Sequence, residues 1–298
     1  MSRYGTPLRY PGGKQKLAPF FLELLDANGL LGGDYVEPYA GGAGVAIQLL
    51  LGRHAARIHL NDSSYPVYAF WRAVVNFPDQ MCRRIASASL TVEQWKKHRE
   101  VVRDCSSHDE LEVGFSTLYL NRCNRSGVLS GGLIGGLEQT GQWGIASRFP
   151  RNELIRRIEA IALHRESIHL RNWDAERFIL KYAANLPLRT LVYCDPPYFG
   201  QSSRLYLDRY TRDDHARLAS IIQTSLPRKW VVSYDSAPAV VELYESRRSF
   251  RYALQYNASR AYKGHEVLFF SDDLAIPRGS VVPFIDEALG SALSALHV

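Results

Sequence analysis

Three chemically distinct groups stand next to one another at Asp195, Pro196 and Tyr198. Two consecutive prolines, Pro196 and Pro197, can neither donate an N–H to a sheet nor continue a helix, so the backbone here takes a stiff, predetermined course. The Asp195 carboxylate and the Pro196 carbonyl therefore form a pair of hydrogen-bond acceptors beside the aromatic face of Tyr198. This combination suits a planar base that carries an exocyclic amine, as adenine does.

These groups follow a short apolar stretch, residues 191–194, whose length and bulky side chains predict a buried strand. In open α/β sheets, ligands bind outside the carboxyl ends of the strands, which is where Asp195 is expected to lie. The sequence therefore predicts an α/β fold with a ligand site at this edge of the sheet.

A glycine-rich turn between a predicted strand, residues 35–37, and a predicted helix, residues 45–50, indicates a second part of the site. Such a turn brings the backbone close to a nucleotide-like ligand at the start of a helix, and it contains Tyr39 and Gly41 directly after Glu37. It lacks the GxGxxG spacing and the Walker lysine, so it favours a ligand without phosphates. A tight turn with a purely structural role is the alternative.

Two acidic residues follow further predicted strands. Asp62 ends the strand predicted at residues 57–62, and an acidic residue at this distance from the turn is placed to accept hydrogen bonds from a ribose diol. Asp174 follows the strand predicted at residues 167–170, beside Trp173, and this pair could flank a bound adenine ring. The alternative for each carboxylate is the N-cap of the helix that follows it.

An N-terminal loop, Pro-Gly-Gly-Lys at residues 11–14, precedes a helix predicted over residues 17–25. Its exposed N–H groups and Lys14 are suited to holding a carboxylate or a phosphate. Gly-Gly-Lys also occurs in ordinary turns, so the loop by itself predicts no particular ligand.

The alternation of strands and helices stops after residue 72 and returns at residue 160, which predicts an inserted, mainly helical module. Within it, helices predicted at residues 92–102 and 109–120 precede a polar, glycine-rich segment, residues 121–136. Arginine and asparagine side chains of this kind grip phosphates and read base edges. A flexible surface loop or a solvated basic face is the alternative. The residues expected to contact nucleic acid are Asn121, Arg122, Asn124, Arg125 and, in a later basic segment, Arg260.

The composition of the 298 residues narrows the class of protein. A net charge of +6 and a pI near 9.1 favour a polyanionic partner. No apolar run approaches the ~20 residues of a membrane span, and the first residues lack the apolar core of a signal peptide, so we expect a cytoplasmic protein that binds no membrane. Four cysteines without a CxxC pair predict reduced thiols and no metal site.

Taken together, the motifs resemble those of the Dam-type (D12 class) DNA adenine-N6 methyltransferases. The resemblance spans residues 8–270 and rests on the order Tyr10-Pro11-Gly12-Gly13-Lys14, Glu37-Pro38-Tyr39-Ala40-Gly41-Gly42, Asp62, Asp195-Pro196-Pro197-Tyr198 and Asn257 with Arg260 and Glu266-Val267-Leu268. It implies a Rossmann-like, S-adenosylmethionine-dependent methyltransferase sheet at residues 1–72 and 160–298. Residues 73–159 would then be an inserted, mainly helical target-recognition domain that binds double-stranded DNA.

The resemblance also implies roles for individual residues. Asp195, Pro196 and Tyr198 are the expected catalytic residues, which hold and activate an adenine flipped out of the duplex. Lys14 suits the carboxylate of the cofactor, and Glu37 either binds its methionine ammonium or anchors the turn. The full set expected around the cofactor is Tyr10, Lys14, Glu37, Tyr39, Gly41, Asp62, Asp174 and Asp195.

Other functions fit the same motifs. An RNA adenine-N6 methyltransferase, a cytosine-N4 methyltransferase and a catalytically silent DNA-binding relative are the alternatives, and a carboxylate rather than a serine at Asp195 favours adenine over cytosine. The segment after Asn121-Arg122 departs from that of Dam enzymes which read GATC, so this recognition sequence is not carried over. A cognate restriction endonuclease is a further expected partner.

Overall fold

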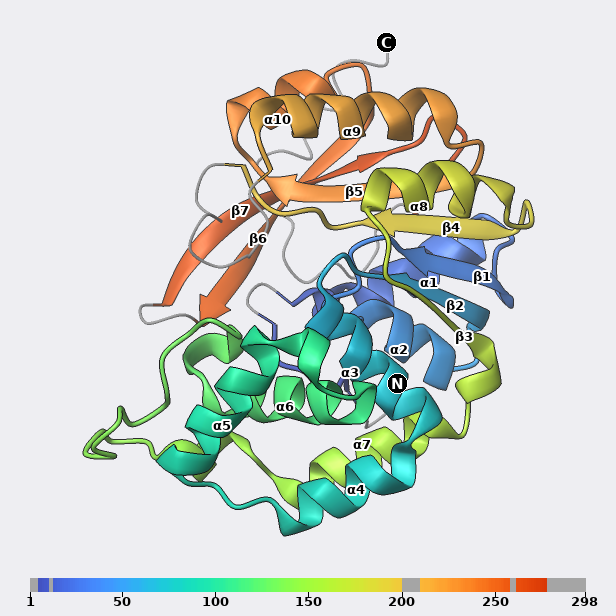
Figure 1. The fold of residues 1–298 in the computed structure, drawn as a ribbon. Helices are drawn as coiled ribbons and strands as arrows, with labels where there is room; N and C mark the ends of the chain where they lie inside the picture. The colour runs from blue at the N-terminus through green and yellow to red at the C-terminus, as the bar shows by residue number, and fades with distance from the viewer. Residues whose placement is uncertain (1–4, 11–12, 200–209, 258–260, 278–298) are drawn as a thin grey trace.

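The computed structural model describes residues 5–10, 13–199, 210–257 and 261–277, and within these residues seven strands form a single sheet. Its strand order is β3-β2-β1-β4-β5-β7-β6 (Figure 1). Strands β1 to β5 pair in parallel, whereas β7 runs antiparallel to both of its neighbours. This sheet confirms the predicted α/β, Rossmann-like fold. The strands are β1 (Gly33–Glu37), β2 (Ala55–Asn61), β3 (Ile168–Arg171), β4 (Thr190–Cys194), β5 (Lys229–Asp235), β6 (Ser249–Asn257) and β7 (Ala261–Phe270).

The central strands β1 and β4 are buried along their whole length. Their side chains alternate between the two faces of the sheet, as a period of two residues requires. Tyr35 and Tyr193 pack into one hydrophobic cluster, and Val36 and Val192 pack into the other. Because both faces are covered, residues 191–194 of β4 form a continuous apolar run rather than an alternation of polar and apolar residues, whereas β1 also buries Asp34 and Glu37.

Helices cover both faces of the sheet (Figure 1). On the face of Val36 and Val192 lie α8 (Ala175–Lys181), α9 (Arg212–Ser225) and α10 (Pro238–Leu243). On the opposite face α1 (Ala18–Ala27) and α2 (Gly44–Leu51) pack against Tyr35 and Tyr193. A further helical layer adjoins α2 and comprises α3 (Tyr65–Asn76), α4 (Pro78–Ser87), α5 (Val92–Arg103), α6 (Glu110–Cys123) and α7 (Arg151–Ala162).

The order of the strands reverses between β1 and β4, because β2 and β3 lie on one side of this pair and β5 lies on the other. Such a switch point opens a crevice at the carboxyl ends of the strands, where ligands of open α/β sheets bind. Glu37 ends β1 and Asp195 follows β4, so two acidic residues reach this crevice from neighbouring strands.

Most of the predicted elements are confirmed to within two residues at either end, among them the strand predicted at residues 57–62 and the helices predicted at residues 17–25 and 92–102. Helices α4 and α10 were not predicted. The polar segment at residues 121–136 is not a loop from its start, because α6 continues to Cys123 before a short turn at Arg125–Gly127.

The residues of the predicted insertion are mainly helical, but they share a core with the sheet. Both predicted boundaries fall inside helices, 72/73 in α3 and 159/160 in α7. One hydrophobic cluster contains Tyr35 of β1, Met81 of α4 and Leu118 of α6. The division of the chain into two domains therefore stays a prediction.

The contact between α3 and α6 yields a test of this shared core. A Cβ added at Gly114 of α6 would lie 2.6 Å from the carbonyl oxygen of Ala69 and 2.8 Å from Cβ of Ala73. We expect Gly114→Ala to lower the free energy of unfolding by about 1–3 kcal/mol, because overpacking outweighs the roughly 1 kcal/mol that alanine adds in helix propensity. Urea unfolding measures the change.

Gly132→Ala is the matched control, since no atom lies within 4 Å of a Cβ added there. It should change the free energy of unfolding by no more than about 0.5 kcal/mol. A Gly114→Ala protein as stable as the unsubstituted chain would show that the two helices do not approach each other this closely.

Candidate active site

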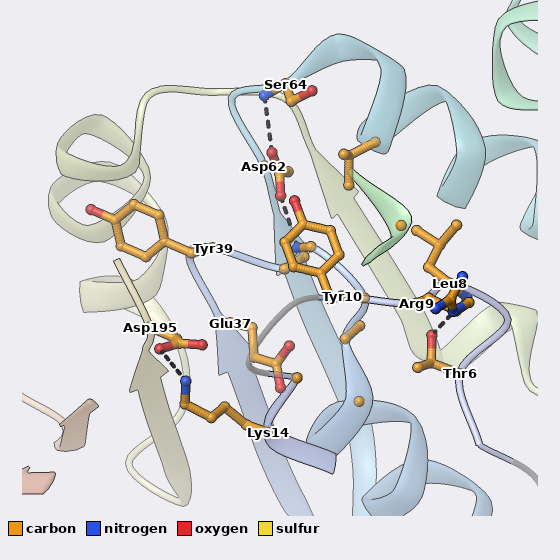
Figure 2. A pocket seen from close by; sticks show the side chains of 18 of the residues that line it. Thr6, Leu8, Arg9, Tyr10, Lys14, Glu37, Tyr39, Asp62, Ser64 and Asp195 are labelled. Atoms are coloured by element: carbon orange, nitrogen blue, oxygen red, sulfur yellow. Dashed lines mark hydrogen bonds and ion pairs between the residues drawn. The ribbon is translucent and has the colours of Figure 1, made fainter. Parts of the chain in front are cut away.

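A cavity of about 430 Å³ lies at the carboxyl ends of β1, β2 and β4, at the switch point of the sheet. Figure 2 shows side chains from the N-terminal segment and from all three strand ends around it. The sequence thus places residues from four distant parts of the chain in one site. The predicted cofactor residues that line it are Tyr10, Lys14, Glu37, Tyr39, Gly41, Asp62 and Asp195, whereas Asp174 is not among the lining residues.

Lys14 joins the N-terminal segment to two strands. Its Nζ lies 3.2 Å from Asp195 Oδ1 and 3.2 Å from Glu266 Oε2, and it donates to the Tyr198 hydroxyl over 2.6 Å. Only 5% of the Lys14 side chain is exposed, and a lysine so deeply buried needs neighbouring negative charge. The two carboxylates supply it, so a contact between Lys14 and a cofactor carboxylate stays a prediction.

Glu266 of β7 is the fully buried centre of this network. Besides its ion pair with Lys14, it accepts hydrogen bonds from the hydroxyls of Tyr198 and Tyr252. Glu266 belongs to one of the motifs on which the family resemblance rests, but no role in the site was predicted for it. The single acidic residue before the apolar run of residues 267–270 was the signal for such a role.

Asp195 faces the cavity with its carboxylate fixed. Ser233 Oγ donates to Asp195 Oδ1 over 2.6 Å, and the Ser233 and Tyr193 hydroxyls are 2.8 Å apart. Burial raises the pKa of Asp195, although the positive charge of Lys14 opposes this rise. A carboxylate with a raised pKa is a better hydrogen-bond acceptor than an exposed one, which suits the predicted contact with an amine.

The residues that follow Asp195 hold an irregular course between β4 and Phe199, as two prolines require. Pro196 is buried and Pro197 lines the cavity. The Tyr198 ring is half-buried, with the Lys14 ammonium 5.1 Å from its centre. The hydroxyl contacts with Lys14 and Glu266 fix the position of this ring.

Glu37 is the second acidic residue at the crevice, and it is 4% exposed. Its Oε1 accepts a hydrogen bond from the Ala46 amide over 3.1 Å, at the start of α2. Burial raises the pKa of Glu37 to about 8, and the nearby Asp195 contributes to the rise. Glu37 therefore keeps its proton near neutral pH unless a cation approaches.

The glycine turn is held by Asp62. Gly41 adopts a φ of +44°, and its amide donates to Asp62 Oδ2 over 2.8 Å, while the Ser64 amide donates to Oδ1 over 3.0 Å. A Cβ at Gly41 would lie 2.9 Å from Cζ of Tyr10, so only glycine lets the Tyr10 ring pack on the turn. Asp62 is not the N-cap of α3, because Ser64 occupies that position.

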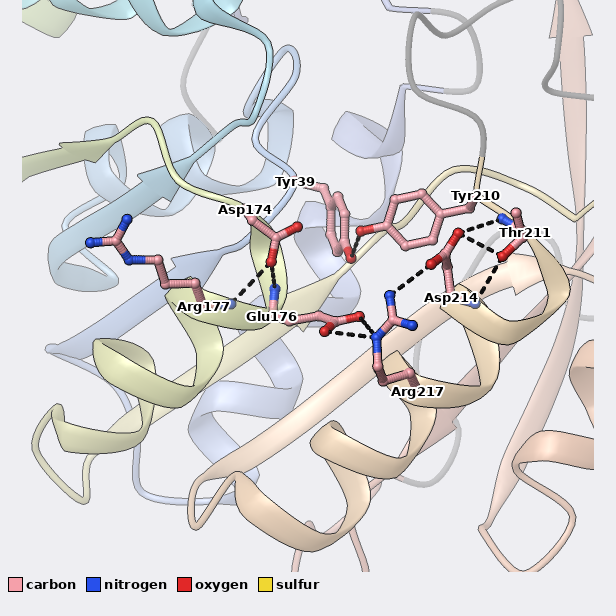
Figure 3. Close-up of polar contacts among 8 residues, drawn as sticks. All are labelled: Tyr39, Asp174, Glu176, Arg177, Tyr210, Thr211, Asp214 and Arg217. Atoms are coloured by element: carbon pink, nitrogen blue, oxygen red, sulfur yellow. Dashed lines mark hydrogen bonds and ion pairs between the residues drawn. The ribbon is translucent and has the colours of Figure 1, made fainter.

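Tyr39 and Asp174 lie at the α8 end of the site. Figure 3 shows the Tyr39 hydroxyl paired with that of Tyr210 over 2.9 Å, and both of these tyrosines line the cavity. Asp174 accepts hydrogen bonds from the amides of Glu176 and Arg177 over 2.9 and 3.1 Å. It is therefore the N-cap of α8, the alternative weighed for it above, and its contact with a cofactor stays a prediction.

The side chains predicted to contact nucleic acid do not form one exposed surface. Asn121 bonds the backbone of Arg9 in both directions over 2.7 Å. Asn124 accepts from the Trp95 indole and donates to two backbone carbonyls. Both asparagines are at most 1% exposed, so their physical role in this structure is to shape the loop rather than to meet a partner at the surface.

The three predicted arginines differ from one another. Arg122 is buried and donates to the carbonyl of Pro7, whereas Arg125 is exposed. Arg260 lies outside the described residues. Of the four predicted contacts that the structure describes, Arg125 is the one whose exposure matches the prediction.

The described part of the chain lacks two other features. It contains no group of three or more His, Cys, Asp and Glu side chains able to hold a metal ion. None of its helices is both long enough and apolar enough to span a bilayer.

Comparison with known proteins adds a family. A family model described as D12 class N6 adenine-specific DNA methyltransferase matches residues 10–258, which is most of the chain. A comparison with curated protein sequences gives no match. The matched residues include every cavity-lining residue contributed by β1, β2 and β4, together with the whole helical layer.

The buried network predicts a large effect of a small change at Glu266. We expect Glu266→Gln to lower the free energy of unfolding by about 3–5 kcal/mol, because it leaves the buried Lys14 with one carboxylate instead of two. Glu110→Gln removes a half-exposed pair with Arg72 and should cost no more than about 1 kcal/mol. Urea unfolding compares the two, and equal losses would contradict a central role of Glu266 in holding Lys14.

The raised pKa of Glu37 predicts that the free energy of unfolding depends on pH. Its pKa is about 8 in the folded protein and near 4.5 in an unfolded chain, so between these values the unfolded state binds fewer protons. The stability that Glu37 contributes therefore falls as the pH rises, by about 1.4 kcal/mol per pH unit. Glu37→Gln should remove this fall.

Urea unfolding at pH 5.5 and 7.5 measures the effect. Over this interval the free energy of unfolding should fall by about 2–3 kcal/mol more in the unsubstituted chain than in Glu37→Gln. Glu245→Gln, at an exposed position, should leave the pH dependence as it is. The interpretation is wrong if Glu37→Gln and Glu245→Gln behave alike.

Proposed function

The chain belongs to the D12 class of N6 adenine-specific DNA methyltransferases, and from this premise we propose that it transfers the methyl group of S-adenosylmethionine to N6 of an adenine flipped out of duplex DNA. We base the proposal on one observation above all. Asp195 is fixed by Ser233 and Lys14 at the cavity of the switch point, directly before two prolines and a tyrosine.

The cavity fits the proposed cofactor in size and charge. Its volume of about 430 Å³ lies within the range of roughly 300–1,000 Å³ usual for small-molecule sites. Glu37, Asp195 and Glu266 bring three carboxyl groups to this end of the site against the single ammonium of Lys14. An excess of acidic groups in a buried site favours a cationic ligand, and S-adenosylmethionine carries a sulfonium and an ammonium.

Individual residues match parts of the cofactor. Asp62 would hold the ribose diol, since its carboxylate lines the cavity beside the glycine turn that it holds. Tyr10 and Tyr39 would offer aromatic faces to the adenine or to the cation. Glu37 would lose its proton and bind the methionine ammonium.

Bound S-adenosylmethionine would supply a methyl group activated by the positive charge on sulfur. The lone pair of adenine N6 is delocalised into the ring, so the amine is a weak nucleophile. Asp195 and the carbonyl of Pro196 would accept hydrogen bonds from N6 and favour the form whose lone pair is available. As the bond from N6 to the methyl carbon forms, the methyl–sulfur bond breaks and its electron pair stays on sulfur. Asp195 would also stabilise the positive charge that develops on N6, which then releases one proton to water.

Positioning of the base supplies much of the remaining rate. Stacking on Tyr198 would offset the unstacking of the flipped adenine, which costs about a few kcal/mol. Because Lys14 and Glu266 hold the Tyr198 hydroxyl, the ring would meet the base without first having to be ordered.

The proposed DNA substrate agrees with the charge of the protein. The chain carries a net charge of +6. The exposed Arg125 lies two residues before Gly127, which lines the cavity together with Val128. We assign Arg125 a contact with DNA. Asn121 and Asn124 would act indirectly, by holding this loop in shape.

The decisive change is Asp195→Asn. The amide keeps the shape but replaces one acceptor by a donor, so methyl transfer to duplex DNA should fall by about 100-fold or more. Transfer of tritiated methyl groups measures the rate, and thermal melting establishes that the variant is folded. Asp213→Asn, on the exposed first turn of α9, should retain full activity.

The product identifies the function. Mass spectrometry of digested DNA should find N6-methyladenine after reaction with the unsubstituted protein. Detection of N4-methylcytosine instead, or full turnover in Asp195→Asn, would overturn the proposed mechanism.

A further inference from the structure

A second charged cluster lines the same cavity at a distance from Asp195 along the N-terminal segment. It consists of Arg9 on that segment, Arg122 at the end of α6 and Arg157 in α7, and all three line the cavity. We call these three residues the arginine cluster.

The backbone around the cluster is fixed from several sides. Arg122 Nε donates to the Pro7 carbonyl over 2.8 Å, and Arg157 Nη1 donates to the Thr6 carbonyl over 2.6 Å. Asn121 clamps both the amide and the carbonyl of Arg9. The backbone of Arg9 is thus held in place, and none of these hydrogen bonds involves its guanidinium group.

The cluster has little negative charge to balance it. In the described part of the chain, Arg157 forms an ion pair with Glu153, while Arg9 and Arg122 form none. Burial, together with Arg157 and Arg9, lowers the pKa of Arg122 to about 9. Burial and the nearby Arg148 lower the pKa of Arg9 in the same way.

Two donors of the cluster have no acceptor. Nη1 of Arg9 and Nε of Arg157 are buried and make no hydrogen bond within the described residues. A buried N–H without a partner is costly, and so is a group of like charges out of water. An anion with several acceptor oxygens would relieve both costs at once, because guanidinium groups bind such anions through parallel hydrogen bonds.

We propose that the arginine cluster binds a phosphate group of the DNA backbone next to the target adenine. This inference rests on the proposed function, because it takes DNA as the substrate. The charge of the exposed Arg148 acts on Arg9, so positive charge continues from the cavity to the protein surface. A DNA strand that enters the cavity also runs along the surface, where it would meet this charge. The loop residues Gly127, Val128 and Ser130 border the same end of the cavity, next to the exposed Arg125.

The carboxylate of the cofactor is the competing anion. It carries one negative charge and belongs to a small ligand that the cavity can enclose. Three arginines with one acidic partner, continued to the surface by a fourth, match a phosphate of a long polyanion better. The two anions lead to different experimental outcomes.

The test measures DNA binding as a function of salt for Arg9→Gln and for Arg9→Lys. A protein that loses one phosphate contact shows a salt slope, log K against log [salt], smaller by about 0.9. We expect Arg9→Gln to weaken binding of a short duplex several-fold and to reduce the slope by this amount. Arg9→Lys should keep most of the slope, because it retains the charge. Isothermal calorimetry with S-adenosylmethionine alone should give the same affinity for both variants.

Arg165→Gln is the matched control, since it removes the same charge from an exposed position at the opposite, amino-terminal end of β3. Its salt slope should equal that of the unsubstituted chain. If Arg9→Gln lowers the affinity for S-adenosylmethionine and leaves the salt slope unchanged, the cluster binds the cofactor carboxylate and the inference is wrong. It is also wrong if Arg9→Gln matches Arg165→Gln in both measurements.

Two outcomes distinguish a missing phosphate site from a missing methyltransferase activity. An unsubstituted chain that methylates DNA, combined with an unaltered salt slope in Arg9→Gln, removes only the phosphate site. An unsubstituted chain that neither binds duplex DNA nor methylates it removes both.

Discussion

The ion pairs of the buried Lys14 are the interaction on which the site depends. A lysine with 5% of its side chain exposed is stable only beside negative charge, and here Asp195 and Glu266 are both 3.2 Å away. These contacts join the N-terminal segment to the end of β4 and to β7, which are far apart in the sequence. The same ammonium holds the Tyr198 hydroxyl, so one charge orients both the acceptor and the aromatic ring of the proposed catalytic set.

The two ends of the cavity carry an excess of opposite charges. At the switch point, the carboxyl groups of Glu37, Asp195 and Glu266 outnumber the ammonium of Lys14, and burial raises the pKa of Glu37 to about 8. At the other end, Arg9, Arg122 and Arg157 share one acidic partner. The proposed methyl donor is a cation and the proposed methyl acceptor is a polyanion, so the two ends of the cavity match ligands of opposite charge.

The sequence predicted the positions that local rules determine. Asp195 and Asp62 follow apolar strands and therefore had to lie at one edge of a parallel sheet, and Gly41 takes a positive φ that glycine favours. These local rules did not predict contacts between residues that are far apart in the sequence. Glu266 reaches Lys14 only because β7 inserts beside β5, a pairing that no local pattern encodes. Tyr210 meets Tyr39 for a similar reason, through the packing of α9 on the far side of β4.

Asn121 and Asn124 show why residue type alone is a weak guide to function. Polar side chains in a glycine-rich segment suggested a nucleic-acid surface, yet both are buried and bind backbone groups of nearby segments. Their consequence for the site is indirect but specific. Asn121 fixes Arg9, the next residue Tyr10 packs on the glycine turn, and the segment then reaches Lys14.

One short segment thus spans both ends of the cavity, with Arg9 at the basic end and Lys14 at the acidic end. Because the helical layer holds it through Asn121, Arg122 and Arg157, its position depends on α6 and α7 as much as on the sheet. The helical layer therefore helps to position the residues of the proposed catalytic site. The hydrophobic core that the layer shares with the sheet holds the basic end and the acidic end of the cavity in place relative to each other.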